Sequence, residues 1–142
     1  MTVTGIDHLV LSCGDTEAAL AFYGGLLALP VDRSNGRCAV RVGRQKINVH
    51  RGKAEFLPAA ANLAFGSADF CLIAQGDIRD IYEELWAKNT PFALDKDGAP
   101  LGILGRTGAL GPMESVYLRD PEGNLVEIAV YIPQGSTDLI NH

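Results

Sequence analysis

The histidines and acidic residues of this chain are its main candidates for chemistry. His8 and His50 lie in short stretches rich in leucine, isoleucine and valine, and Glu127 lies between Val126 and Ile128. Imidazole and carboxylate groups serve as general acids, general bases and metal ligands. Taken alone, a histidine on an apolar strand is more often a core residue, and a glutamate on a strand more often faces solvent. A metal site or an acid–base site therefore depends on which elements position these side chains.

The cysteines do not indicate a disulfide framework or a nucleophile. Cys13, Cys38 and Cys71 are odd in number and widely spaced, and no C-x-x-C pair occurs. We expect reduced and largely inert buried thiols, as in a cytoplasmic protein. Cys71 follows Asp69 by two residues, so on a strand it could line the same cavity as Asp69.

Length and composition limit the classes of partner. A chain of 142 residues with 47% hydrophobic residues can form one domain or two small halves, and it is too apolar for intrinsic disorder. The net charge of −5 and the lack of a basic block argue against nucleic acid and anionic membranes. No apolar run approaches the roughly 20 residues of a membrane span. With no signal-peptide core at the N-terminus, the predicted location is the cytoplasm.

Two similar series of elements must position the candidate residues. The first series is a strand over 6–11, a helix over 18–27 capped by Asp15 or Thr16, and strands over 37–42 and 45–50. The second series is a strand over 68–73, a helix that begins after Asp77 and ends near residue 90, and strands over 92–94, 115–118 and 125–131. Strand alternation places His8 on one face with Ile6 and Val10. Helical spacing predicts that Trp86 lies in the core.

These series indicate an internal repeat. His8 corresponds to Asp69 with an offset of 61 (69 − 8), and Asn48 corresponds to Glu127 with an offset of 79 (127 − 48). The difference of 18 (79 − 61) fits an insertion in the Gly-rich segment over 95–111, which is predicted to be a loop. Each half would have a sheet with a helix on one face and an open second face. Two such open faces would enclose a cavity.

Several motifs of this chain resemble the vicinal oxygen chelate superfamily. They are the strand Ile-Asp-His-Leu-Val-Leu at 6–11, the helix end Phe22-Tyr23, and the block Arg-Asp-Pro-Glu-Gly-Asn-Leu-Val-Glu at 119–127. The superfamily includes glyoxalase I, fosfomycin-resistance thiol transferases, bleomycin-resistance proteins and extradiol dioxygenases. Three further stretches, at 46–50, 66–69 and 106–109, are similar to small glyoxalase domain-containing proteins. The resemblance covers roughly residues 5–131.

The resemblance implies an α+β fold of two βαβββ modules that form a cupped, barrel-like mixed sheet. It predicts a single domain with module one at about 4–58, module two at about 66–133, and a polar tail at 134–142. The superfamily's ligand positions fall on His8, Asn48, Asp69 and Glu127. His8 and Glu127 match the usual ligands, whereas Asn48 and Asp69 depart from them. His50, two residues after Asn48, could complete the shell, so the predicted ligands are His8, His50, Asp69 and Glu127.

The same resemblance implies a cofactor, an activity and the roles of individual residues. The expected cofactor is a divalent ion (Zn, Ni, Mn, Fe or Co), and the expected catalytic base is Glu127. The residues expected to bind substrate are Arg106, Thr107 and Asn48. Arg106 is expected to lie in a lid loop. The expected activity is that of a lyase, an isomerase or a related enzyme of the glyoxalase and dioxygenase group. Its substrate would be a small molecule with vicinal oxygens. The alternative is a metal-free antibiotic-binding protein of the bleomycin-resistance type. A homodimer is expected in either case.

Overall fold

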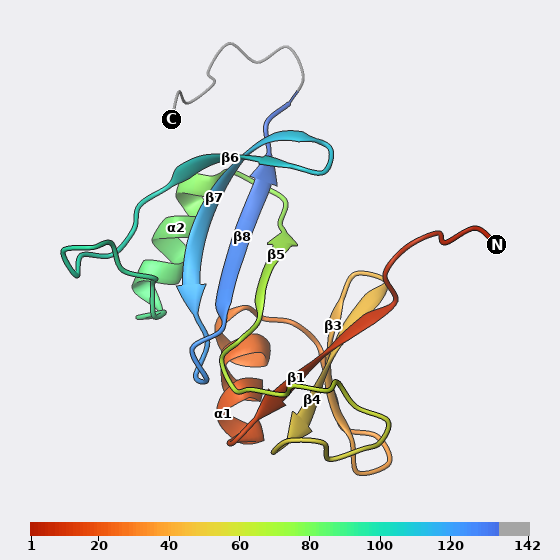
Figure 1. Ribbon diagram of the computed structural model, residues 1–142. Helices are drawn as coiled ribbons and strands as arrows, with labels where there is room; N and C mark the ends of the chain where they lie inside the picture. Colours follow the sequence, from red (N-terminus) through yellow and green to blue (C-terminus); the bar gives the residue numbers. More distant parts are fainter. Residues whose placement is uncertain (134–142) are drawn as a thin grey trace. The chain divides into compact units, whose positions relative to one another are not determined.

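The computed structural model describes residues 1–133, and the chain divides into two units. Unit 1 is Met1–Ala68 together with Pro121–Asn124, and unit 2 is Asp69–Asp120 together with the chain from Leu125 onward. Each unit contains a strand, a helical segment and three further strands in that order (Figure 1). This order confirms the predicted α+β class with two βαβββ modules. The predicted polar tail at 134–142 lies outside the described residues.

Unit 1 is a four-stranded sheet with helical turns on one face. Its elements are β1 (His8–Cys13), α1 (Thr16–Leu20), the π-helical η1 (Ala21–Leu26), β2 (Val31–Asp32), β3 (Cys38–Val42) and β4 (Gln45–Arg51). The strand order is β1-β4-β3-β2, and β1 pairs with β4 in parallel. Asp15, the first of the two predicted caps, accepts a hydrogen bond from Ala18 N at 3.0 Å and starts α1. Side chains of one sheet face form the core, namely Leu11, Val40, Ile47 and Val49.

Unit 2 repeats this plan. Its elements are β5 (Asp69–Ile73), α2 (Ile78–Ala87), β6 (Leu104–Gly108), β7 (Gly111–Arg119) and β8 (Leu125–Tyr131). The strand order is β5-β8-β7-β6, and β5 pairs with β8 in parallel. Asp77 caps α2, as predicted, by accepting from Arg79 N at 2.8 Å. Figure 1 shows α2 beside β7, where Val116 and Leu118 are fully buried.

Three expectations about unit 2 are wrong. The segment over 95–111 is not all loop, because Leu104–Gly108 forms β6 and pairs with β7, which is longer than predicted. The glycines of this segment lower its intrinsic strand propensity, and pairing with a long neighbouring strand overrides that local signal. The predicted strand over 92–94 consists of isolated bridges at Phe92 and Leu94. Trp86, which was expected in the core, is 53% exposed.

The strand registers confirm the repeat. His8 lies opposite Lys46 in unit 1, and Asp69 lies opposite Leu125 in unit 2. These pairs have the two offsets found in the sequence, 61 (69 − 8) and 79 (125 − 46). His8 and Asp69 therefore occupy equivalent positions in the two sheets, and so do Asn48 and Glu127. No helix within residues 1–133 has the length and apolarity that spanning a bilayer requires.

Candidate functional site

Glu127 lies in the middle of the open face of the unit 2 sheet. Val126 and Ile128, its neighbours on β8, are buried, so strand alternation directs Glu127 to the opposite face. The register places Glu127 opposite Cys71 on β5 and opposite Tyr117 on β7. A carboxylate is thus flanked by a thiol and a phenol on the face that does not carry the apolar core.

A hollow of about 370 Å³ lies on this face, and we call it the carboxylate hollow. Its polar lining residues are Asp69, Arg106, Tyr117, Arg119 and Glu127. Two carboxylates and two guanidinium groups therefore meet in one cavity, which suits a small polar ligand that carries negative charge or several oxygen atoms. Thr107 is not among the lining residues, since it follows Arg106 on β6 and alternation directs it to the other face.

The polar side chains of the carboxylate hollow hold one another in place. Ser115, which is fully buried, donates from Oγ to Oε2 of Glu127 at 2.6 Å. Arg106 donates from Nε to the hydroxyl oxygen of Tyr117 at 2.8 Å. Arg106 thus belongs to a paired strand and contacts the next strand, rather than lying in the predicted lid loop. Both Glu127 and Arg106 are oriented before any ligand arrives, as a binding or catalytic site requires.

The two neighbours of Glu127 in register are kept neutral. Burial raises the pKa of the Cys71 thiol to about 11, and the charge of Glu127 and a hydrogen bond to it act in the same direction. Burial also raises the pKa of Tyr117, against the opposing effect of its hydrogen bond from Arg106. Cys71 is therefore a poor nucleophile near neutral pH. This agrees with the prediction that the thiols are inert, although Cys71 is exposed rather than buried.

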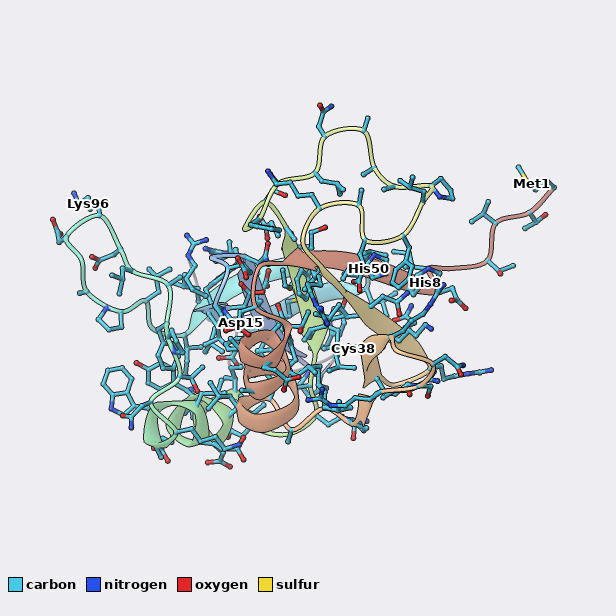
Figure 2. All side chains as sticks on the ribbon, turned by 90° about the horizontal axis from the view of Figure 1, so that it is seen from below. Met1, His8, Asp15, Cys38, His50 and Lys96 are labelled. Atoms are coloured by element: carbon cyan, nitrogen blue, oxygen red, sulfur yellow. The ribbon has the colours of Figure 1, made fainter. Side chains whose placement is uncertain are left out.

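The open face of the unit 1 sheet carries His8, Asn48 and His50. Their partners in the β1–β4 register show that the three share one face. The side chain of His8 is 46% exposed, and its Nδ1 lies 2.8 Å from Oδ1 of Asp7, which lowers the pKa of Asp7. A carboxylate on one ring nitrogen orients the imidazole and leaves Nε2 available, as is common for histidines that bind metals. Figure 2 shows His8 and His50 on the strands of this unit.

His50 lines a second hollow of about 400 Å³ within unit 1, which we call the apolar hollow. Its other lining residues are mostly apolar and include Val10, Phe56 and Leu63. The His50 ring meets the Phe56 ring edge to face at 5.0 Å, and burial lowers the pKa of His50. This hollow was missed from the sequence because Phe56 and Leu63 belong to a connector without regular structure.

The predicted ligands are divided between the two units. His8 and His50 belong to unit 1, and Asp69 and Glu127 belong to unit 2. Within residues 1–133, neither unit brings three or more His, Cys, Asp or Glu side chains together where they could hold a metal ion. The donor types, imidazole nitrogen and carboxylate oxygen, suit a divalent transition ion. Each unit taken alone supplies two of the four predicted donors.

The conspicuous Asp-Pro-Glu-Gly-Asn motif has a structural role in unit 1. Oε1 of Glu122 accepts hydrogen bonds from Gly14 N at 2.7 Å and from Asp15 N at 3.3 Å, at the start of α1. Oδ1 of Asn124 accepts from Ala68 N at 2.9 Å, just before β5 begins. The motif therefore fixes the ends of elements, and Glu127, three residues further on, faces the carboxylate hollow.

Sequence reasoning missed three residues of the carboxylate hollow and its surroundings. Tyr117 and Arg119 on β7 line it, and Ser115 holds Glu127. The signal for these residues is the alternation along β7 combined with its register against β8. The sequence shows the alternation but does not show the register.

Comparison with known proteins gives the family. No family model matches the chain. It is 38% identical over 133 residues to virulence protein STM3117 of Salmonella typhimurium, covering 93% of this chain and 88% of that protein. It is 36% identical over 131 residues to the glyoxalase domain-containing protein RDO1 of Mycosarcoma maydis, covering 92% of this chain and 70% of that protein.

Solved structures agree with these relatives. The crystal structure of the Salmonella virulence protein has a TM-score of 0.84 at 37% identity, covering 93% of this chain and 100% of that one. A lactoylglutathione lyase from Agrobacterium tumefaciens has a TM-score of 0.65 at 24% identity, covering 91% of this chain and 95% of that one, and shows a likeness of fold alone. The two βαβββ units and these relatives together show that the chain belongs to the vicinal oxygen chelate superfamily of glyoxalase, bleomycin-resistance and dioxygenase proteins.

Proposed function

We propose that this chain is a metal-dependent enzyme that acts on a small anionic substrate with adjacent oxygen atoms. The observation that carries the proposal is the position of Glu127 in the carboxylate hollow, beside Asp69 and two guanidinium groups. A carboxylate held there can accept a proton from a bound substrate. The cavity of about 370 Å³ is within the usual size range of small-molecule sites.

His8 and His50 of unit 1 and Asp69 and Glu127 of unit 2 would hold the ion, which would be Zn, Ni, Mn, Fe or Co. Such an ion, when bound, would supply Lewis-acid chemistry for negative charge that develops on adjacent substrate oxygens. Because neither unit holds three of these donors, the proposal requires donors from both units, either of one chain or of two chains in a homodimer. Asn48, on the same sheet face as His8, would bind substrate in this arrangement.

The remaining steps depend on the chain's own residues. Ser115 binds Oε2 of Glu127, which leaves Oε1 to take the proton from the carbon beside the substrate oxygens. Arg106, oriented by Tyr117, binds the anionic group of the substrate. The raised pKa of Tyr117 and of Cys71 keeps both groups neutral. They therefore add no negative charge that would compete with the substrate's anionic group.

A metal-free binding protein is the second candidate, and the apolar hollow favours it. That hollow is mostly apolar and contains His50 as its titratable group, so it could hold an apolar ligand without an ion. Proteins of the bleomycin-resistance type hold a cationic drug in an acidic groove. The carboxylate hollow does not fit that role, since Arg106 and Arg119 balance its two carboxylates.

Elemental analysis and metal-dependent melting separate the two candidates. We expect the purified wild-type chain to contain a divalent ion, and we expect one of the five ions to raise the melting temperature after chelation. Saturation at a hundred times the dissociation constant adds about 2.7 kcal/mol to the free energy of unfolding. His8→Ala and Glu127→Gln should each remove the metal-dependent rise in melting temperature. Glu83→Gln makes the same type of substitution at an exposed position of α2 and should retain that rise. A wild-type melting curve that no ion changes would favour the metal-free binding protein.

A further inference from the structure

A third hollow, of about 340 Å³, lies at the C-terminal end of α2 within unit 2. We call it the α2-end hollow. It is lined by Trp86, Asn89, Thr90, Pro91, Phe92, Leu94 and Pro100. None of these side chains carries a charge, in contrast to those of the carboxylate hollow. The α2-end hollow has no role in the function proposed above.

The aromatic wall of this hollow is supported by ring–ring contacts and is half exposed to solvent. Trp86 is 53% exposed, yet its ring stacks on Tyr82 at 6.0 Å and contacts Phe92 at 5.5 Å. Tyr82 and Phe92 also contact each other at 5.1 Å. Three mutually packed rings hold the indole in place and leave one part of it uncovered. A large aromatic surface held in this way suits stacking with a flat ring.

The hollow is also lined by Thr90, whose hydroxyl group is buried. Thr90 is 5% exposed, and its Oγ1 has no hydrogen-bond partner among the described residues. Buried hydroxyl groups are nearly always hydrogen-bonded, because an unpaired one lowers stability. The hydroxyl of a residue that lines a hollow can obtain its partner from a molecule bound there.

The end of α2 fixes the position of that hydroxyl. Asn89 N donates to Trp86 O at 3.0 Å and Thr90 N donates to Leu85 O at 3.1 Å, while Asn89 has φ of 55°. This is a Schellman ending, in which the residue at the Thr90 position normally makes an apolar contact with the last turn. These backbone hydrogen bonds fix the position of Thr90, which lines the same hollow as Trp86. An apolar side chain at this position would serve the helix equally well.

We propose that the α2-end hollow is a binding site for a small, neutral, planar aromatic molecule that carries one hydrogen-bonding group. The ring would lie against Trp86, and the polar group would pair with Oγ1 of Thr90. The uncharged lining offers no ion-pair partner, which disfavours an ionic ligand relative to a neutral one. The volume of about 340 Å³ is near the lower end for ligand sites and limits the ligand to one or two rings.

Benzamide is a suitable probe, and the chain supplies its own reporter. Trp86 is the only tryptophan, so a saturable change in its emission during titration reports occupancy of this hollow. Saturation-transfer NMR of the probe gives a second measurement that needs no tryptophan. Toluene lacks the polar group and benzoate adds a charge, so these two compounds test each part of the proposed chemistry.

We expect benzamide to bind saturably, toluene to bind about fivefold more weakly, and benzoate to bind at least about tenfold more weakly. Thr90→Val should weaken benzamide to the level of toluene and leave toluene unchanged, while Thr90→Ser should retain benzamide affinity. Trp86→Leu should abolish the saturation-transfer signal, and Leu110→Ala, at an exposed leucine outside the hollow, should not.

The melting temperature of Thr90→Val is an independent check. It should equal or exceed that of the wild type, because the variant removes an unpaired buried hydroxyl. The proposal is overturned if benzamide does not saturate, if benzoate binds equally well, or if Thr90→Val binds benzamide like the wild type. A marked fall in the melting temperature of Thr90→Val would show that the hydroxyl already has a partner, and would also overturn it.

Discussion

The reactivity of Cys71 reports directly on the position of Glu127. Cys71 is exposed as a residue, although its thiol is partly buried, and its alkylation requires ionisation of that thiol. Burial of the thiol, the charge of Glu127 and a hydrogen bond to that carboxylate raise the pKa of Cys71 from 9.0 to about 11. Glu127→Gln removes the charge and keeps the size of the side chain, and this is the perturbation we choose.

The size of the effect follows from the pKa. A thiol whose pKa is raised by about two units contains about a hundredfold less thiolate at any pH below both values, and so alkylates that much more slowly. Burial is the largest cause of the shift and remains in the variant. The rate for Glu127→Gln should therefore rise by about tenfold, short of the full hundredfold.

Iodoacetamide labelling with peptide mass spectrometry measures this rate for each cysteine separately. The half-buried Cys38 of unit 1 serves as an internal reference, and Glu83→Gln serves as the control for loss of a carboxylate elsewhere in unit 2. Labelling of wild-type Cys71 should rise tenfold for each unit of pH in the mildly alkaline range. If wild-type Cys71 reacts like a free thiol, or if Glu127→Gln leaves its rate unchanged, then Glu127 does not face Cys71 and the geometry of the carboxylate hollow is refuted.

Three further predictions concern unit 1. Gly66→Ala should lower the free energy of unfolding by about 2 kcal/mol, as measured by urea denaturation. The reason is that Gly66 has φ of 72° and an added methyl group would meet the carbonyl oxygen of Glu122. An unchanged urea midpoint would contradict this prediction. Glu122→Ala should cost about 1–2 kcal/mol through two lost hydrogen bonds from Gly14 and Asp15, whereas Glu122→Gln, which keeps an acceptor, should cost less. NMR titration should give His50 a pKa below 6.5. Phe56→Ala should raise this pKa because the variant reduces the burial of His50. A wild-type pKa at or above 6.5 would refute this prediction.

The His50 shift also predicts a pH dependence of stability. Its pKa in the folded chain is below the value of 6.5 that it has when unfolded, so between these two values the unfolded chain binds more protons. Stability should therefore fall as the pH decreases from 6.5 through the folded pKa. His50→Gln should reduce this part of the pH dependence, which chemical denaturation at several pH values would measure.

Patterns confined to one element were predictable from the sequence. The alternation of β8 gave its bounds and the direction of Glu127, and the two offsets gave the equivalence of His8 with Asp69. The carboxyl groups of Asp15 and Asp77 mark helix starts because side-chain capping is a local interaction. These features depend on neighbours in sequence or on a period that the sequence displays.

Features that depend on pairing between distant segments were not predictable. β6 forms because β7 offers it a partner, although its own glycines disfavour a strand. Tyr117 and Ser115 reach Glu127 only through the register of β7 against β8. Trp86 has helical spacing typical of a core residue, yet the face of α2 that it occupies is only partly covered, by Tyr82 and Phe92.

Cobalt binding followed by the visible absorption of the bound ion is the most direct test of the proposed metal chemistry. We expect the metal-free wild-type chain to bind one Co²⁺ per chain, with His8→Ala and Glu127→Gln each abolishing the absorption although they alter different units. Equal binding by the wild type and both variants, or no binding by the wild type, would contradict a metal site built from His8 and Glu127.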